Sequence, residues 1–246
     1  MIEKKQNFER IAKRISRSGV ASRRESERLI NSGLVTLNGV KISNPAIKVC
    51  HDDQVVVKGK LIPNKEPTRL WLYHKPSGLI TSHSDEKGRA TVFDQLPDGI
   101  PKLISIGRLD LNSEGLLLLT NNGELKRYLE LPSMGFARKY RVRARGKIED
   151  ESLDSLRNGV TINKQRFKPM SIRVDKIMGS NCWLSISLTE GKNREVRKGL
   201  ESVGLLVNRL IRISYGPFFL GKLKRNNLIE VRAESIKHGL PNFKHE

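Results

Sequence analysis

The sequence predicts an α+β protein with two domains, a small one built from helices and a β-hairpin and a larger one with a mainly antiparallel, mixed sheet. Three observations support this prediction. Apolar residues recur at helical spacing over residues 8–31, Asn38-Gly39 separates two short β-like runs, and from residue 69 onward strand-like runs interleave with helical segments. Because these segments show no regular strand–helix–strand repeat, they favour an α+β fold.

The composition is dominated by basic charge. The 246 residues, enough for one large or two modest domains, include 46 Lys+Arg against 26 Asp+Glu, which gives a net charge of +20. Such an excess favours a polyanionic partner, since basic side chains release the counterions condensed on it. No apolar run approaches the roughly 20 residues that cross a bilayer, and the N-terminus lacks the apolar centre of a signal peptide. We therefore expect a cytoplasmic protein that faces nucleic acid rather than a membrane.

Common signatures of other function classes are missing. Cys50 and Cys182 lie far apart without metal-ligand spacing, and the five histidines show none either, so we expect no metal. No phosphate-binding glycine loop, serine-nucleophile elbow or zinc-protease motif is present. Aromatic residues make up only 5%, which argues against a surface that stacks several bases.

In order along the chain, residues 8–20 are expected to form an amphipathic helix that stops at Gly19. Ser22 and Glu25 form a capping box, which predicts a second helix through about Asn31.

Two short β-like runs, 34–37 and 40–42, flank Asn38-Gly39, a strong signal for a type I′ hairpin, and a further strand is expected over 54–58. The Pro- and Lys-rich segment that follows has little periodicity and is typical of a linker. We therefore divide the chain into a domain over residues 1–60, a linker over 61–68 and a second domain over 69–246.

Basic residues concentrate at the start of the first domain. Residues 1–68 hold 14 Lys+Arg against 7 Asp+Glu, and nine of these bases fall within the first 28 residues. Arginine can fork onto phosphate oxygens, so we expect RNA contacts from Arg14, Arg17, Arg23 and Arg24. The alternative is that these basic side chains only face the solvent on the helix surfaces and contact no RNA.

The expected elements of the second domain follow from apolar runs and their stop signals. Strands are expected at 69–74, 79–82, 103–106, 116–120, 138–147, 168–174, 182–188 and 209–215. Helices are expected at 91–96, 122–131, 149–157 and 193–203.

Between the third and fourth of these strands, a polar turn carries Asp110 beside Arg108. A carboxylate held at a rigid strand end is a common way to display a catalytic group, although an Asx-type turn would explain it as well. The turn begins like a calcium loop, but Asn121 stands where that loop needs its closing glutamate. We therefore expect no calcium at this turn.

Two segments of the first domain resemble a known RNA-binding module. They are SGVASRR (18–24) and INSGLVTLNG (30–39). They are similar to the alpha-L module shared by a ribosomal small-subunit protein, tyrosyl-tRNA synthetase and several RNA-modifying enzymes. The resemblance implies a basic groove for structured RNA.

The second domain resembles the pseudouridine synthases of the RsuA/RluB type. The matching segments are Lys75-Pro76-x-Gly78, GRLDLNSEGLLLLTNNGEL (107–125), EGKNREVRK (190–198) and RLIRISYGP (209–217). Asn122 and Ser113 depart from the usual aspartate and the frequent threonine. GRATVFDQLP (88–97) and the EGKNREVR form are closest to the branch that modifies large-subunit ribosomal RNA.

This resemblance implies roles for individual residues. Asp110 would be the essential carboxylate, paired with Arg197, and Tyr140 would stack on the target base. Leu210 would pack on the base's other side, and Arg108 would fill the space left by the everted base. Lys75 matches the first motif and is expected at the substrate. Taken singly, Tyr140 can also be an ordinary strand aromatic, Leu210 plain core and Arg197 a surface helix charge.

Together these features predict a monomeric ribosomal RNA pseudouridine synthase that uses no cofactor, with large-subunit ribosomal RNA as its partner. Two alternatives from other classes remain. One is a catalytically silent ribosome-assembly factor that uses the same basic surface. The other is a glycosidase that uses Asp110 and Glu114 as a carboxylate pair, which requires both acids to flank one bond.

Overall fold

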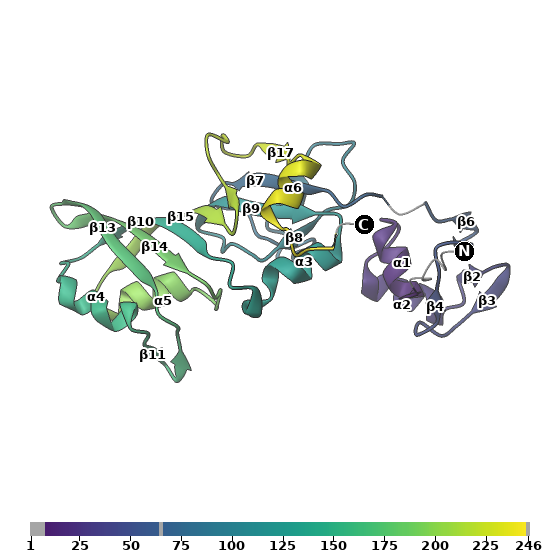
Figure 1. The fold of residues 1–246 in the computed structure, drawn as a ribbon, viewed down its shortest axis with the longest axis horizontal. Helices are drawn as coiled ribbons and strands as arrows, with labels where there is room; N and C mark the ends of the chain where they lie inside the picture. The colour runs from purple at the N-terminus through teal and green to yellow at the C-terminus, as the bar shows by residue number, and fades with distance from the viewer. Residues whose placement is uncertain (1–7, 64–65, 245–246) are drawn as a thin grey trace. The chain divides into compact units, whose positions relative to one another are not determined.

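The structure is a computed structural model that describes residues 8–63 and 66–244. One compact unit ends at Thr68 and a second begins at Arg69. The helices and strands of both units are drawn in Figure 1, and the buried hydrophobic residues of each unit cluster separately from those of the other. Lys4 and Lys5, two of the bases noted above, and residues 64–65 of the expected linker lie outside the described residues. Of the helices in the described part of the chain, none has the length and apolar character needed to span a bilayer.

The two helices predicted for the first unit are confirmed as α1 (Ile11–Arg17) and α2 (Arg23–Asn31). Ser22 caps α2 by accepting a hydrogen bond from the Glu25 amide at 3.2 Å. Helix α1 begins later than expected, because Glu9 and Arg10 form strand β1, which pairs with β4 (Lys48–Val49).

A four-stranded sheet in the order β3-β2-β5-β6 completes this unit. Its strands are β2 (Val35–Leu37), β3 (Val40–Ile42), β5 (Val55–Val57) and β6 (Lys60–Leu61). Asn38 and Gly39 both have positive φ, 49° and 84°, as a type I′ turn requires. Strand β6 and the buried Ile62 belong to this unit, so the linker expected from residue 61 begins too early.

The second unit is built on a nine-stranded sheet whose main path runs β13-β14-β10-β15-β9-β7-β17, with β16 beside β15 and β8 beside β9. Only β15 and β9 pair in parallel, so the expected mainly antiparallel, mixed sheet is confirmed. The strands are β7 (Leu70–Lys75), β8 (Ile104–Ile106), β9 (Ser113–Thr120), β10 (Arg138–Arg145), β13 (Ser171–Met178), β14 (Asn181–Leu188), β15 (Leu206–Tyr215), β16 (Phe218–Phe219) and β17 (Leu228–Glu230).

Four helices pack on this sheet in two groups (Figure 1). Helices α4 (Asp150–Arg157) and α5 (Glu195–Ser202) cover one face of the β13-β14-β10 half, where their leucines join a core with Val142 and Leu184. Helices α3 (Gly123–Glu130) and α6 (Ala233–Gly239) contribute to a second core with Leu116 and Leu118 of β9. Three of these helices were predicted, but α6 was not.

Short elements account for most differences from the predicted ones. Residues 79–82 make only an isolated bridge between Ile80 and Thr91, and the helix expected at 91–96 is a single 3-10 turn, η1 (Phe93–Gln95). The hairpin β11 (Thr161–Ile162) and β12 (Gln165–Arg166), η2 (Pro132–Met134), β16 and β17 were not predicted. Runs of two or three residues are too short to show a period, so tertiary pairing alone defines them.

Candidate active site

The parallel pairing of β9 with β15 forms one wall of the pocket that Asp110 lines. Ser113 lies opposite Leu210, and Gly115 lies opposite Arg212. A Cβ atom on Gly115 would come within 2.3 Å of the Arg212 carbonyl oxygen, and Gly115 has a φ of +104°. Glycine is required here for both reasons, because L side chains rarely adopt this φ and the two backbones nearly touch.

The turn that carries Asp110 is closed by its backbone. The Ser113 amide donates to the Asp110 carbonyl oxygen at 3.0 Å. Beneath the turn, the Lys75 ammonium donates to the carbonyl oxygens of Ser113 (2.9 Å), Pro76 (3.0 Å), Asp110 (3.1 Å) and Leu111 (3.4 Å). The Asp110 carboxylate is therefore not needed to hold the turn, unlike in the Asx-type alternative.

Lys75 has no exposed surface. Its burial lowers its pKa to about 8, against the opposing influence of Asp110 and Glu114, which favour the charged form. An ammonium that is fully enclosed by backbone carbonyls cannot reach RNA. The expected substrate contact of Lys75 is therefore wrong, and its side chain instead supports the turn.

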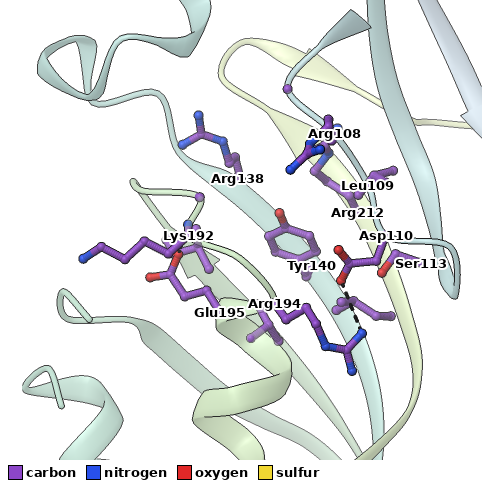
Figure 2. Close-up of a pocket in the computed structure, with 15 residues that line it drawn as sticks. Arg108, Leu109, Asp110, Ser113, Arg138, Tyr140, Lys192, Arg194, Glu195 and Arg212 are labelled. Atoms are coloured by element: carbon purple, nitrogen blue, oxygen red, sulfur yellow. Dashed lines mark hydrogen bonds and ion pairs between the residues drawn. The ribbon is translucent and has the colours of Figure 1, made fainter. Parts of the chain in front are cut away.

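The carboxylate of Asp110 faces the pocket, with its side chain 34% exposed. Its ion-pair partner is Arg194, whose Nη1 lies 3.9 Å from Oδ2 (Figure 2). Arg194 precedes α5 with a φ of +52°, an uncommon conformation for a residue other than glycine. Arg194, the residue with this uncommon backbone conformation, is therefore also the residue whose guanidinium lies next to the Asp110 carboxylate.

Tyr140 of β10 and Leu210 of β15 are among the apolar residues that line the pocket with Asp110, and the Tyr140 ring lies beside the Asp110 carboxylate (Figure 2). Both side chains are buried, whereas Arg108 is exposed and also lines the pocket. The pocket holds about 120 Å³. The structure thus brings together Asp110, Tyr140, Leu210 and Arg108 as the sequence predicted.

Arg197 does not form the expected ion pair with Asp110. Its Nη2 donates to the Asn112 carbonyl oxygen at 2.8 Å, and its Nη1 donates to the Val207 carbonyl oxygen at 3.0 Å. Burial lowers the pKa of Arg197, with a further contribution from the Arg194 charge, while Asp110 opposes both. Arg197 therefore fastens the turn to β15, and Arg194 takes the place that was predicted for it.

Two further arginines line the pocket and were missed. Arg212 is buried and donates from Nε to the Leu116 carbonyl oxygen at 2.7 Å. Arg138 donates from Nη2 to the Tyr215 hydroxyl at 2.8 Å and from Nη1 to the Thr189 carbonyl oxygen at 3.0 Å. Arg212 lies within the RLIRISYGP segment, so that motif contained the signal.

A buried carboxyl pair supports the loop before α5. Glu195 accepts a hydrogen bond from the Lys192 amide at 2.9 Å, and Glu190 accepts one from the Lys168 amide at 2.7 Å. Burial, followed by the adjacent Glu190, raises the pKa of Glu195 to about 8. Burial also acts to raise the pKa of Glu190, but hydrogen bonds from Glu195, Lys168 and Lys192 outweigh it and lower that pKa. Near neutral pH the pair therefore shares one proton, held by Glu195.

Unsatisfied polar atoms gather around this pocket. In the described part of the chain, three buried side-chain atoms outside the carboxyl pair lack a hydrogen-bond partner: Ser113 Oγ, Arg197 Nε and Arg212 Nη2. Ser113 and Arg212 line the pocket, and Arg197 holds the adjacent turn. Because buried polar groups are normally satisfied, their concentration here marks a functional site.

Glu114 is engaged elsewhere. Arg209 donates to its two carboxylate oxygens at 2.8 and 3.1 Å, and Arg225 lies 2.9 Å from one of them. The hydrogen bond from Arg209 is the largest cause of its lowered pKa. Glu114 does not line the pocket of Asp110. The two acids therefore do not flank one bond, which removes the glycosidase alternative.

The four arginines predicted to contact RNA in the first unit differ in their exposure. Arg14 is only 7% exposed and donates to the His51 carbonyl oxygen at 3.3 Å, so the prediction for it is wrong. Arg17 is largely covered and pairs with Glu9 at 3.1 Å. Arg23 and Arg24 are exposed on the first turn of α2 and remain available to a partner.

Comparisons with known proteins agree on one family. Residues 69–202 match the RNA pseudouridylate synthase family, and residues 9–55 match the S4 domain. An uncharacterised RNA pseudouridine synthase of Rickettsia conorii is 48% identical over 93% of this chain and 99% of its own length. Ribosomal large subunit pseudouridine synthase B of Haemophilus influenzae is 39% identical over 95% of this chain and 69% of its own length. A crystal structure of a pseudouridylate synthase has the same fold, with a TM-score of 0.66 at 21% identity over 94% of this chain and 99% of the other.

Proposed function

The chain belongs to the RNA pseudouridylate synthase family, and we propose that it converts a uridine of large-subunit ribosomal RNA to pseudouridine with Asp110 as its catalytic carboxylate. The observation that carries this proposal is the presentation of Asp110. Its turn is closed by backbone hydrogen bonds and by Lys75, so its carboxylate is available in a pocket beside Tyr140 and Leu210.

The chemistry of the reaction fits this arrangement. Pseudouridine formation breaks the bond between ribose C1′ and base N1, joins C1′ to base C5, and replaces the C5 hydrogen by this new bond while N1 gains a proton. The carboxylate of Asp110 acts on the ribose, as a nucleophile at C1′ or as a base at C2′. Both roles need it ionised, and the guanidinium of Arg194 lies 3.9 Å from it as a counter-charge.

Tyr140 and Leu210 suit the two faces of a uracil ring. The Tyr140 ring lies beside Asp110 (Figure 2) and provides a stacking surface. Leu210, on the neighbouring strand, supplies apolar contact from another wall of the same pocket. Because a base inside a helix cannot reach such a pocket, the uridine must be flipped out. Arg108, exposed beside the pocket, is suited to the space that the base leaves.

Two features support ribosomal RNA as the substrate. The S4 domain and the net charge of +20 suit a large folded RNA whose phosphates supply most of the affinity. Relatives from Haemophilus influenzae and Buchnera aphidicola, each 39% identical to this chain, are named for the large ribosomal subunit. We propose that the protein acts as a monomer and that its own side chains carry out the whole isomerisation.

Mapping of pseudouridines in ribosomal RNA from cells with and without the gene tests this function. We expect one or more pseudouridines of the large-subunit RNA to disappear with the gene and to return when purified protein acts on a transcript of that RNA. An unchanged map would favour the silent assembly factor, and loss of a small-subunit pseudouridine would contradict the proposed substrate alone.

A further inference from the structure

One face of the β13-β14-β10-β15 half-sheet is left open by the helices. Along β10, side chains alternate between buried and exposed, with Tyr140, Val142 and Ala144 on the covered face. The four outward positions from Lys139 to Arg145 are all basic and exposed. Strand β14 shows the same alternation, with its apolar side chains buried on the helix-covered face.

We propose that this outer face binds a second segment of RNA, separate from the one that carries the target uridine. The contact is made by the arginine strip, defined here as Arg141, Arg143 and Arg145 of β10. This inference rests on the proposed function, because it assigns a further contact for the same RNA substrate.

Neighbouring strands place two further arginines beside the strip, and each of them is paired with an acid. Arg209 of β15 lies opposite Arg143, and Arg173 of β13 lies opposite Ser185, which in turn pairs with Arg141. The Arg141 guanidinium lies 4.7 Å from the centre of the Trp183 ring. Stacking of this kind holds a guanidinium flat while its edge remains free to bind phosphate.

The acids on this face are already bound by other groups. Asp175 accepts hydrogen bonds from Arg173 at 2.9 Å and from Ser185 at 2.7 Å. Glu114 is held by Arg209 and Arg225, as described above. Among the described residues, no carboxylate lies within ion-pairing distance of Arg143 or Arg145. The strip therefore keeps an unbalanced positive charge.

The spacing of the strip suits a nucleic acid backbone. Alternate residues of a strand lie about 6.6–6.8 Å apart, close to the separation of successive phosphates along an RNA strand. Three like charges at this spacing repel one another, and opposite charges on adjacent strands would stabilise the sheet better. A polyanion removes this repulsion, and the guanidinium forks match its phosphate oxygens.

The strip is distinct from the active site. Tyr140, which lines the catalytic pocket, and Arg141 are adjacent in one strand, so their side chains leave the sheet on opposite faces. An RNA segment bound to Arg141, Arg143 and Arg145 is therefore not the segment whose uridine lies beside Asp110. A large folded RNA can supply both segments, whereas a short hairpin that fills the pocket supplies only one.

The test compares a triple variant, Arg141→Gln with Arg143→Gln and Arg145→Gln, with the full-length wild-type protein. The control carries Arg127→Gln, Arg232→Gln and Lys237→Gln, which removes the same charge from exposed positions outside the strip. Binding is measured against a transcript of large-subunit ribosomal RNA over a series of salt concentrations. Pseudouridine formation is measured on the same transcript with enzyme in excess over RNA and at a concentration that saturates binding.

We expect the strip variant to bind the transcript about tenfold or more weakly. Its plot of log K against log salt should be less steep by about 2–3, which corresponds to the loss of three phosphate contacts. The control should change binding much less, and all three proteins should form pseudouridine at similar rates once bound. Equal binding by strip variant and wild type, or an equal loss in the control, would overturn the proposal. If the triple variant does not fold, the single variant Arg143→Glu gives the same comparison. Absence of pseudouridine with the wild type would contradict the proposed function instead.

Discussion

Lys75 donates a hydrogen bond to the backbone carbonyl oxygen of Asp110 at 3.1 Å, so a fully buried ammonium holds the turn that presents the candidate catalytic carboxylate. The lysine lies at the end of β7, directly across the ladder from Gly115 of β9. The turn is thus supported from below by one side chain, and Arg197 fastens its other end through Asn112. Because Lys75 and Arg197 hold the turn, the side chain of Asp110 is not needed to support it.

Substitution of Lys75 should therefore lower activity by displacing Asp110 from its position in the pocket. Lys75→Met leaves buried carbonyl oxygens without their donor, and we expect it to lower the free energy of unfolding by about 2–4 kcal/mol. The rate of the chemical step should fall more than RNA affinity, since no part of Lys75 is exposed. Denaturant unfolding and single-turnover assays check this. Loss of RNA binding with an unchanged rate and stability would instead support the direct RNA contact of Lys75 that was predicted from the sequence.

Gly115 should tolerate no side chain. Gly115→Ala places a Cβ within 2.3 Å of the Arg212 carbonyl oxygen at a φ of +104°, and we expect a loss of more than about 2 kcal/mol of stability. Gly99→Ala is the matched control, because Gly99 also has positive φ but nothing lies within 4 Å of its added Cβ. Thermal and denaturant unfolding of both variants measure the difference. Similar losses in the two would show that the close approach of β9 and β15 is unimportant.

The Glu190–Glu195 pair should make stability depend on pH. Glu195 has a pKa raised from 4.5 to about 8, so the folded state holds a proton that the unfolded chain releases. Its stabilising contribution is full below about pH 4.5 and is lost as pH rises through about 8. The free energy of unfolding of the wild type should therefore fall between pH 5 and 8 relative to that of Glu195→Gln.

Burial lowers the pKa of Lys75 from 10.5 to about 8, but Lys75 is present in both proteins, so its titration cancels in this comparison. Parallel stability curves for the wild type and Glu195→Gln would contradict a proton held by Glu195.

Substitutions of Arg194 and of Arg197 should have different effects, one on the reaction rate and the other on stability. Arg194 is about half exposed and pairs with Asp110, so Arg194→Gln should lower the rate of pseudouridine formation about 10–100-fold with little change in stability. Arg197 is bonded to two backbone carbonyls, so Arg197→Gln should lower stability by about 1–3 kcal/mol. Rates and unfolding curves of both variants test this assignment. If Arg197→Gln instead lowered the rate and Arg194→Gln lowered the stability, Arg197 would be the ion-pair partner of Asp110.

Local signals carried much of the prediction of the fold. Asn38-Gly39 determined a hairpin and Ser22 determined the start of a helix, because turn geometry and capping depend on a few adjacent residues. Asp110, Tyr140 and Leu210 were predicted to meet only through resemblance to a family, since 100 positions separate the first from the last.

Burial of individual charged residues was not predictable. Lys75 and Arg14 look like ordinary basic residues in the sequence, yet the structure buries both, and both donate to backbone carbonyl oxygens, Lys75 to several and Arg14 to that of His51. Arg194 and Arg197 lie three positions apart in one motif, and it is Arg194, with its positive φ, that pairs with Asp110. These outcomes depend on tertiary contacts that leave no local pattern.

The most direct test of the central claim compares Asp110→Asn with the wild type on a transcript of large-subunit ribosomal RNA. Asp98→Asn, which neutralises an exposed acid outside the pocket, is the control. We expect D110N to lower pseudouridine formation at least about 10³-fold, with stability and RNA affinity close to those of the wild type, and D98N to remain active. Pseudouridine formation by D110N at a rate near that of the wild type would contradict the account.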